Sequence, residues 1–127
     1  ALFFMDLDGL KQINDTLGHV RGDEALRDTA EVLRTTFRGS DIVARLGGDE
    51  FVALAHLHGE RDVETLCTRL REHLRAFNAL RQRPYEIDLS IGATLVDEPA
   101  AQDLEEFIAR ADEAMYQEKR AASARNP

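Results

Sequence analysis

Cysteine is nearly absent from this sequence, which has a single thiol, Cys67, among 127 residues. One cysteine excludes an intrachain disulfide framework and a zinc site built from several cysteines, and it fits a reducing compartment. No apolar run approaches the roughly 20 residues that a membrane-spanning helix needs, and no signal peptide opens the chain. We therefore expect a cytoplasmic domain without membrane contact of its own, whether or not the larger protein is membrane-anchored.

Positive charge is also scarce, with 16 Lys and Arg against 24 Asp and Glu, which gives a formal net charge of −8. Much of the excess lies in residues 85–119, which contain ten acidic and two basic residues. A protein that binds the nucleic-acid backbone generally needs the opposite balance. We therefore expect no nucleic-acid partner, and an anionic ligand would have to be held by a metal ion or by a few placed cations.

The chain has no internal repeat, linker or low-complexity stretch, and 43% of its residues are hydrophobic. Its length and composition predict one globular domain over residues 1–127. Because the sequence begins inside an apolar run and without an initiator methionine, we expect it to be an N-terminally truncated fragment of a larger protein.

Hydrophobic periodicity predicts the element order β-α-β-β-α-β-α, with a short helical turn after the first strand. The first six elements match the ferredoxin-like split βαβ pattern. We therefore predict an α+β fold in which helices pack around an antiparallel sheet. The predicted strands are 1–7, 42–46, 50–55 and 87–95, the turn is 11–17, and the helices are 23–37, 62–77 and a final one from 104 toward 119.

Four acidic residues are predicted to converge at one edge of this sheet. Right-handed crossovers leave the third strand antiparallel beside the first, so the end of one lies next to the start of the other. Those positions hold Asp6, Asp8, Asp49 and Glu50. Carboxylate oxygens suit Mg²⁺ or Mn²⁺, and such ions can clamp the attacking and leaving oxygens of a nucleotidyl transfer. The alternative is that they are solvated acids at strand ends.

The hairpin between the second and third strands contains Gly47 and Gly48. Glycine permits positive φ and lets a ligand approach the backbone closely, and the free N–H groups could face a phosphate. A plain hairpin turn is the alternative. No Gly-Lys-Ser/Thr follows, which excludes a P-loop.

The segment RLGGDEF, residues 45–51, resembles the signature of the GGDEF domain, the diguanylate cyclase family. Residues 5–26, 90–93 and 111–119 resemble the family's other motifs, in order and with matching spacing. The resemblance covers almost the whole chain. It implies the cyclase-palm form of the ferredoxin-like fold and a bacterial nucleotidyltransferase. That enzyme condenses two GTP into cyclic di-GMP and releases pyrophosphate within a head-to-head pair of domains.

The resemblance implies that Asp6, the backbone carbonyl of Leu7 and Asp49 bind the metal, Mg²⁺ or Mn²⁺, with Glu50 beside them. The family's proposed proton acceptor for the ribose 3′-hydroxyl falls on Asp49. A metal-bound carboxylate is a weak base at neutral pH, so activation of the hydroxyl by the metal stays open as the alternative.

The family's guanine-binding residues fall on Asn14 and Asp23. A carboxylate can accept hydrogen bonds from the N1–H and N2–H₂ groups of guanine, a pair that adenine lacks, and an amide can serve O6 or N3. From the sequence alone, Asn14 could equally end a helix and Asp23 could cap one. His19 belongs to the same loop, where it shapes the loop or lines the substrate site.

The resemblance assigns triphosphate binding to Gly47, Gly48 and Lys119, and we expect Lys119 to share catalysis with the two acids of the signature. A phosphate-binding arginine of the family is replaced by Ser123. Arg125 could take its place, or the contact could be lost.

Arg38 and Asp41 form an R-x-x-D just before the second strand and resemble the family's inhibitory site for cyclic di-GMP. Arginine can bond guanine N7 and O6 bidentately. We interpret His56 and His58 as surface or strand-end residues and the arginines of residues 69–83 as solvated.

These features favour a product-inhibited cyclase whose partners are GTP, cyclic di-GMP, a second such domain and an upstream sensor domain. A D-x-L-T-x-L-x-N-R segment that normally precedes the first strand is absent, which could weaken activity. Three alternatives remain: a catalytically weak module that senses cyclic di-GMP or GTP, a cyclase that accepts adenine, and a structural ferredoxin-like domain. The intact signature favours catalysis, and Asp23 argues against adenine.

Overall fold

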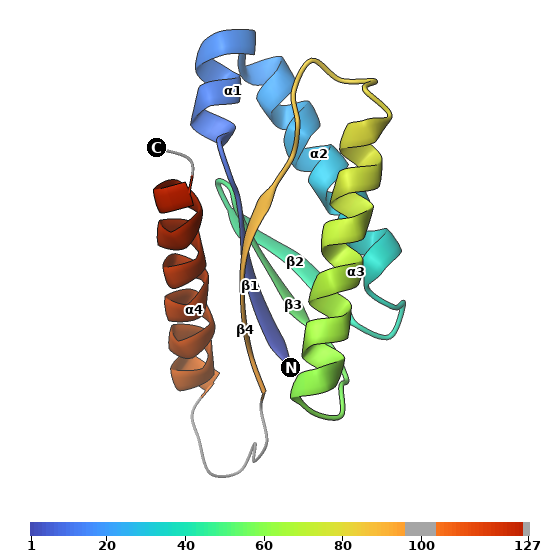
Figure 1. The fold of residues 1–127 in the computed structure, drawn as a ribbon, viewed down its shortest axis with the longest axis vertical. Helices are drawn as coiled ribbons and strands as arrows, with labels where there is room; N and C mark the ends of the chain where they lie inside the picture. The colour runs from blue at the N-terminus through green and yellow to red at the C-terminus, as the bar shows by residue number, and fades with distance from the viewer. Residues whose placement is uncertain (96–103, 126–127) are drawn as a thin grey trace.

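The structure is a computed structural model that describes residues 1–95 and 104–125. Its four strands form one sheet in the order β2-β3-β1-β4, and every neighbouring pair is antiparallel. The predicted α+β fold with an antiparallel sheet is therefore confirmed (Figure 1). The strands are β1 Leu2–Leu7, β2 Ile42–Gly47, β3 Glu50–Leu54 and β4 Leu89–Thr94.

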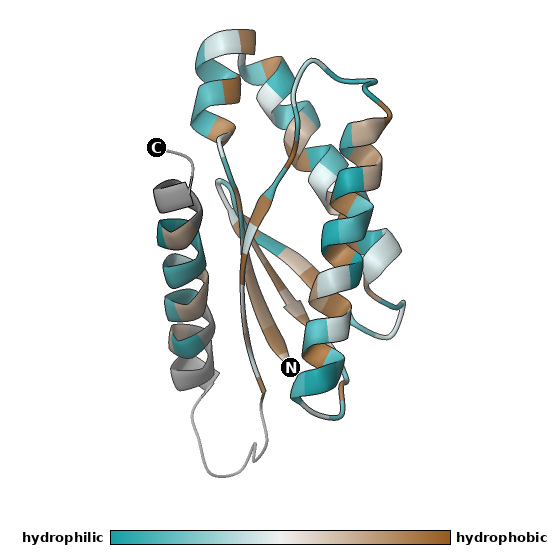
Figure 2. Ribbon diagram, viewed as in Figure 1, coloured by the Kyte–Doolittle hydropathy of each residue, from teal (hydrophilic) through white to brown (hydrophobic). Residues whose placement is uncertain are grey.

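Helices cover both faces of the sheet. The helices α2 and α3 lie on one side, α4 lies on the other side against β1 and β4, and α1 lies beyond the end of β1 and contacts α2 (Figure 1). Hydrophobic residues gather on the strands and on the helix faces turned toward them (Figure 2). Within the described residues, no helix is long and apolar enough to cross a membrane. The helices are α1 Leu10–Leu17, α2 His19–Thr36, α3 Glu60–Ala79 and α4 Leu104–Arg125.

The central strand β1 is buried along its whole length because both of its faces are covered. Successive side chains of a strand point to opposite faces. Phe3 and Met5 join the larger core under α2 and α3, whereas Leu2 and Phe4 pack against Met115 of α4. Burial of each such side chain contributes about 1.5–3 kcal/mol to folding. This apolar strand therefore holds the polar residues at its end in fixed positions.

The helix predicted from Asp23 begins four residues earlier, at His19. Gly18, with a φ of 92°, ends α1 and directly precedes α2, so the two helices follow each other without a loop. Asp23 lies inside α2 and is exposed, and its interpretation as an N-cap is wrong. The short turn predicted at 11–17 is α1. Hydrophobic periodicity located the buried face of α2 but could not detect the first turn of this helix, residues 19–22, which is mostly exposed.

Candidate active site at the ends of β1 and β3

Asp6 is the one buried acidic residue of the described chain, with 7% of its surface exposed. It lies opposite Glu50 of β3 and Ser90 of β4 in the sheet register. Its Oδ2 accepts a hydrogen bond from Lys119 Nζ at 2.6 Å, while its Oδ1 is buried and has no hydrogen-bond partner among the described residues. Burial raises the pKa of Asp6 to about 6, Lys119 opposes the rise and the Asp49 carboxylate adds to it. The site thus keeps one desolvated carboxylate oxygen unsatisfied.

Asp49 and Glu50 come to Asp6 through the hairpin that joins β2 and β3. The Leu7 amide donates to the Asp49 carbonyl at 2.9 Å, which fixes the hairpin against the end of β1. Gly47 and Gly48 have φ values of 144° and 52°, which only glycine adopts readily. A register shift between Arg45 and Gly47 accompanies the turn. The glycines therefore let the chain turn sharply enough to place Asp49 beside Asp6.

Lys119 faces the acids from α4. The pKa of Lys119 is raised by its bond to Asp6 and by the charges of Asp8 and Asp49. These three acids therefore gather around one ammonium group. Asp8 is turned partly toward β4, because its Oδ1 accepts a hydrogen bond from Ser90 Oγ at 2.8 Å. Burial raises the pKa of Asp8, and this bond opposes the rise.

A divalent cation fits the donors at this place. Within the described residues, no group of three or more His, Cys, Asp or Glu side chains is arranged to hold a metal ion. The candidate donors are instead two carboxylates, Asp6 and Asp49, and the Leu7 carbonyl, with Glu50 alongside. A small set of hard oxygen donors leaves coordination positions for substrate phosphates, as Mg²⁺ sites in phosphoryl-transfer enzymes do. The unsatisfied Asp6 Oδ1 is the atom that such an ion would satisfy.

The position of α4, and with it Lys119, is fixed by Glu118, a residue that the sequence reasoning missed. Glu118 Oε1 accepts a hydrogen bond at 3.2 Å from the Ile91 amide of β4, the edge strand of the sheet, and it pairs with Arg71 of α3. Met115, Glu118 and Lys119 share one helix face because they are three and four residues apart. The spacing from buried Met115 was the available signal.

Asn14 of α1 packs directly against α2 at Gly22. A Cβ atom added to Gly22 would lie 1.7 Å from Asn14 Oδ1. Gly22 is buried, and Asp23 follows it on the exposed side of α2, with exposed His19 at the start of that helix. Because glycine inside a helix costs about 1 kcal/mol relative to alanine, its presence marks a close approach. The structure thereby brings Asn14 and Asp23 to the same helix junction.

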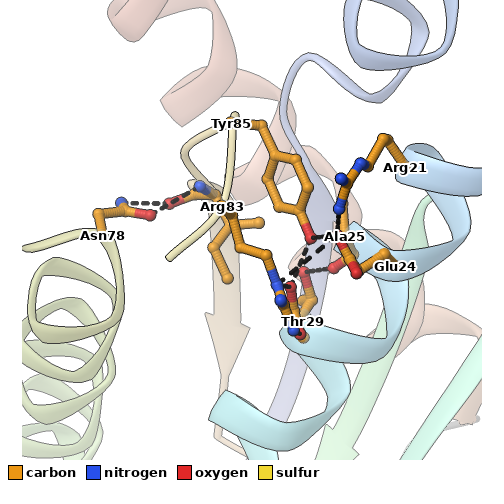
Figure 3. A network of polar contacts seen from close by, with 9 residues as sticks. Arg21, Glu24, Ala25, Thr29, Asn78, Arg83 and Tyr85 are labelled. Carbon is orange, nitrogen blue, oxygen red and sulfur yellow. Dashed lines mark hydrogen bonds and ion pairs between the residues drawn. The ribbon is translucent and has the colours of Figure 1, made fainter. Parts of the chain in front are cut away.

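A polar network ties the loop between α3 and β4 to α2 (Figure 3). Tyr85 Oη donates to Asp28 Oδ2 at 2.5 Å, and Arg83 Nε donates to the same carboxylate at 3.0 Å. The Asn78 side chain closes the loop by bonding both the N–H and the C=O of Ile87. Burial alone would raise the pKa of Asp28, but the contacts with Arg83 and Tyr85 outweigh this effect and lower it. The network therefore holds this loop against the part of α2 that directly follows Asp23.

The Arg38–Asp41 segment forms a tight turn. The Asp41 amide donates to the Arg38 carbonyl at 2.9 Å, and Asp41 Oδ2 accepts from the Arg38 amide at 2.9 Å. A cavity of about 310 Å³ lies against this turn and is also lined by Arg69. Arg69 Nη2 donates to the Thr36 carbonyl at the end of α2.

The prediction that the arginines of residues 69–83 are solvated is confirmed for the exposed Arg69 and Arg83, whereas Arg71 is half-buried. All three also contact another element, which the sequence did not predict. The side chains of Ser123 and Arg125 lie outside the described residues, so the replacement of the missing arginine stays a prediction.

The fold and this acidic site together define a class of protein. Its members are α+β domains that carry carboxylates and a lysine where the end of the central strand meets a glycine hairpin. The family model for "Diguanylate cyclase, GGDEF domain" matches residues 1–125, and the chain belongs to that family.

Relatives of known function match almost the whole chain. It is 39% identical to cyclic di-GMP phosphodiesterase NbdA of Pseudomonas aeruginosa over 94% of this chain and 15% of that protein. It is 35% identical to diguanylate cyclase DosC of Escherichia coli K12 over 94% of this chain and 26% of DosC. The chain thus spans about a quarter or less of these two proteins.

Among solved structures, the GGDEF domain of DgcB from Caulobacter crescentus, in complex with c-di-GMP, matches with a TM-score of 0.80. The two chains are 28% identical, and the match covers 94% of this chain and 71% of that one.

Proposed function

We propose that this domain is a diguanylate cyclase that condenses two GTP into cyclic di-GMP. The 3′-oxygen of each GTP attacks the α-phosphorus of the other. Each attack breaks the bond to the bridging oxygen of the β-phosphate and releases one pyrophosphate, and the hydroxyl proton leaves with a base or solvent. The observation that carries the proposal is the buried Asp6 carboxylate, which has one oxygen unsatisfied and lies beside Asp49 and Lys119.

Asp6, the Leu7 carbonyl and Asp49 would hold the metal, Mg²⁺ or Mn²⁺, with Glu50 supporting them. When bound, the ion supplies charge stabilisation at the α-phosphate and lowers the pKa of the attacking hydroxyl. When metal and GTP bind, Lys119 gives up its ion pair with Asp6 and neutralises charge on the triphosphate instead. Its side chain is 45% exposed, so it can reach a ligand without breaking the core. Asp49 is the candidate proton acceptor, and the Gly47 and Gly48 amides border the phosphates.

Guanine recognition is assigned to Asn14 and Asp23, with His19 lining the same site. Asn14 lies against Gly22, the residue before Asp23, and this supports the assignment, because one base edge could then reach an amide and a carboxylate together. A carboxylate accepts hydrogen bonds from the N1–H and N2–H₂ groups of guanine, whereas adenine has no matching pair of donors.

Catalysis requires two copies of the domain, because each GTP must meet the α-phosphate of the other. We therefore propose a head-to-head homodimer that an upstream sensor domain brings together, in the cytoplasm where GTP is supplied. Cyclic di-GMP bound at Arg38 and Asp41 would inhibit the enzyme. The c-di-GMP complex of the DgcB domain supports product binding by this kind of domain.

A catalytically weak domain that senses cyclic di-GMP or GTP is the second candidate. The relative NbdA favours it, because a protein named for degrading cyclic di-GMP contains a segment 39% identical to this chain.

The test is to incubate the concentrated chain, alone and fused to a dimerising segment, with GTP and Mg²⁺, and to identify the products by chromatography and mass. We expect cyclic di-GMP and two pyrophosphates per product, none from Glu50→Gln, and weaker inhibition by added product in Arg38→Ala. If even the fused chain forms no product but still binds cyclic di-GMP, the cyclase proposal fails and the sensing module replaces it.

A further inference from the structure

The cavity beside the Arg38–Asp41 turn is lined by two histidines that the proposed function does not use. His56 and His58 lie in the loop that follows β3, and both line the cavity of about 310 Å³ with Arg38, Asp41, Asp62 and Arg69. The loop thus closes the cavity from one side, α3 closes it from another, and the turn closes it from a third.

Both acids of the cavity lining are bonded to main-chain amides. Asp41 accepts from the amides of Arg38 and His56, at 2.9 and 3.4 Å, and Asp62 accepts from the His58 amide at 3.1 Å. These bonds fix the loop that carries the histidines and partly offset the negative charge of the carboxylates. The nitrogen donors of the lining side chains are the guanidinium groups of Arg38 and Arg69 and the two imidazoles, and Ser40 and Thr65 add hydroxyl groups. Such a set of donors is suited to a phosphodiester.

The two imidazoles form a close pair. Their ring centroids are 5.3 Å apart and the rings meet edge to face at 88°. Both imidazoles are exposed and line the cavity, whereas Leu57 between them is half-buried, packs against the core and borders the same cavity. Two imidazolium ions this close repel each other, so the pair is expected to take up one proton rather than two when an anion binds.

We propose that His56 and His58 contact a phosphate of cyclic di-GMP in this cavity, and that product binding takes up about one proton. The inference rests on the proposed product binding at Arg38 and Asp41. A phosphate beside an imidazole favours the charged form of the imidazole. The added affinity is therefore greatest in acid, where the imidazole carries its charge, and is lost as the pH rises and the imidazole becomes neutral. Product inhibition thus tightens in acid.

The test is calorimetric titration of the chain with cyclic di-GMP between pH 6 and pH 8, in two buffers of different ionisation enthalpy. We expect binding at pH 6 to be about twentyfold tighter than at pH 8, with close to one proton taken up near pH 7. The double variant His56→Gln/His58→Gln should bind at pH 8 within about twofold of the wild type and lose the pH dependence. His73→Gln is the matched control and should keep it, because His73 bonds Thr36 and does not line the cavity.

Wild-type binding without proton uptake, or a double variant that keeps the pH dependence, overturns the role of the histidines and leaves product binding intact. Absence of binding at every pH, in the wild type as in Arg38→Ala, overturns the inhibitory site itself and the histidine role with it.

Discussion

The two candidate ligand sites of this domain differ in how the fold supports them. The acidic site at the ends of β1 and β3 is built on the central strand, and its key carboxylate, Asp6, is 7% exposed. The cavity beside Arg38 is built from loops and from the surface of α3, and most of its lining is exposed. Charges in the first site are desolvated and strongly coupled, whereas charges in the second are screened by water and salt. Chemistry is therefore expected to depend on residues that the core fixes, and regulation on residues that the surface can change.

The largest expected effect comes from Asp49→Asn, which should abolish function at the acidic site and leave ligand binding at the Arg38 cavity unchanged. Removal of one metal-binding carboxylate should lower the rate of cyclic di-GMP formation by about 10²–10³-fold or more, because transition-state charge loses its preorganised partner. Affinity for cyclic di-GMP, measured by calorimetry, should stay within about twofold of the wild type. Parallel losses of rate and product affinity would show that the sites are one unit.

Asp6→Asn should show that the acidic site is maintained at a cost in stability. The folded-state pKa of Asp6, about 6, lies above the ordinary aspartate value of 3.8, so folding is opposed by ionised Asp6 and the penalty grows as pH rises from 4 to above 6. In chelator-containing buffer at pH 7.5, the variant should unfold with a free energy about 1–3 kcal/mol higher than that of the wild type. The gain should disappear near pH 4.

Denaturant unfolding at the two pH values measures this difference. Asp88→Asn is the control, since Asp88 is exposed, and it should change stability little at either pH. A variant that is less stable than the wild type at pH 7.5 would contradict the desolvation account of Asp6.

Gly22→Ala should weaken GTP binding without weakening the fold. The added methyl group would meet the tip of the Asn14 side chain, which can rotate away, while alanine favours the helix by about 1 kcal/mol. We expect a KM for GTP about tenfold higher, as for loss of one or two hydrogen bonds to the base. Asn14→Ala should give a similar KM, and Gly39→Ala, which has open space around it, should leave KM unchanged.

Tyr85→Phe should give the smallest effect. It removes the hydroxyl that donates to Asp28 and Glu24 but leaves the ring in place. We expect a loss of about 1 kcal/mol in the free energy of unfolding, because Arg83 still pairs with Asp28. Tyr116→Phe, at an exposed position of α4, should cost nothing measurable. If both variants lost the same free energy of unfolding, the proposed role of the network in holding the loop would be contradicted.

The sequence was most informative where burial dictates structure. The apolar run of β1 and the glycine hairpin predicted the sheet edge at which Asp6 and Asp49 meet, since strand pairing leaves few alternatives. It was least informative for long polar side chains. The pairing of Arg71 with Glu118 and of Arg83 with Asp28 depends on how α3, α4 and α2 lie in space, which no local pattern encodes. The interpretation of His56 and His58 as surface residues is confirmed, since both are exposed after β3, but no local pattern shows which cavity they line.

The central claim is that the acidic sheet end is a metal-dependent nucleotidyl-transfer centre. The most direct measurement is the rate of cyclic di-GMP formation from GTP as Mg²⁺ is raised, in the fused dimeric wild type and in its Asp6→Asn variant. We predict a rate that rises and saturates with Mg²⁺ in the wild type and stays at background in the variant, although the variant is expected to be the more stable protein in the absence of metal. An Asp6→Asn protein that forms cyclic di-GMP at the wild-type rate would contradict the claim.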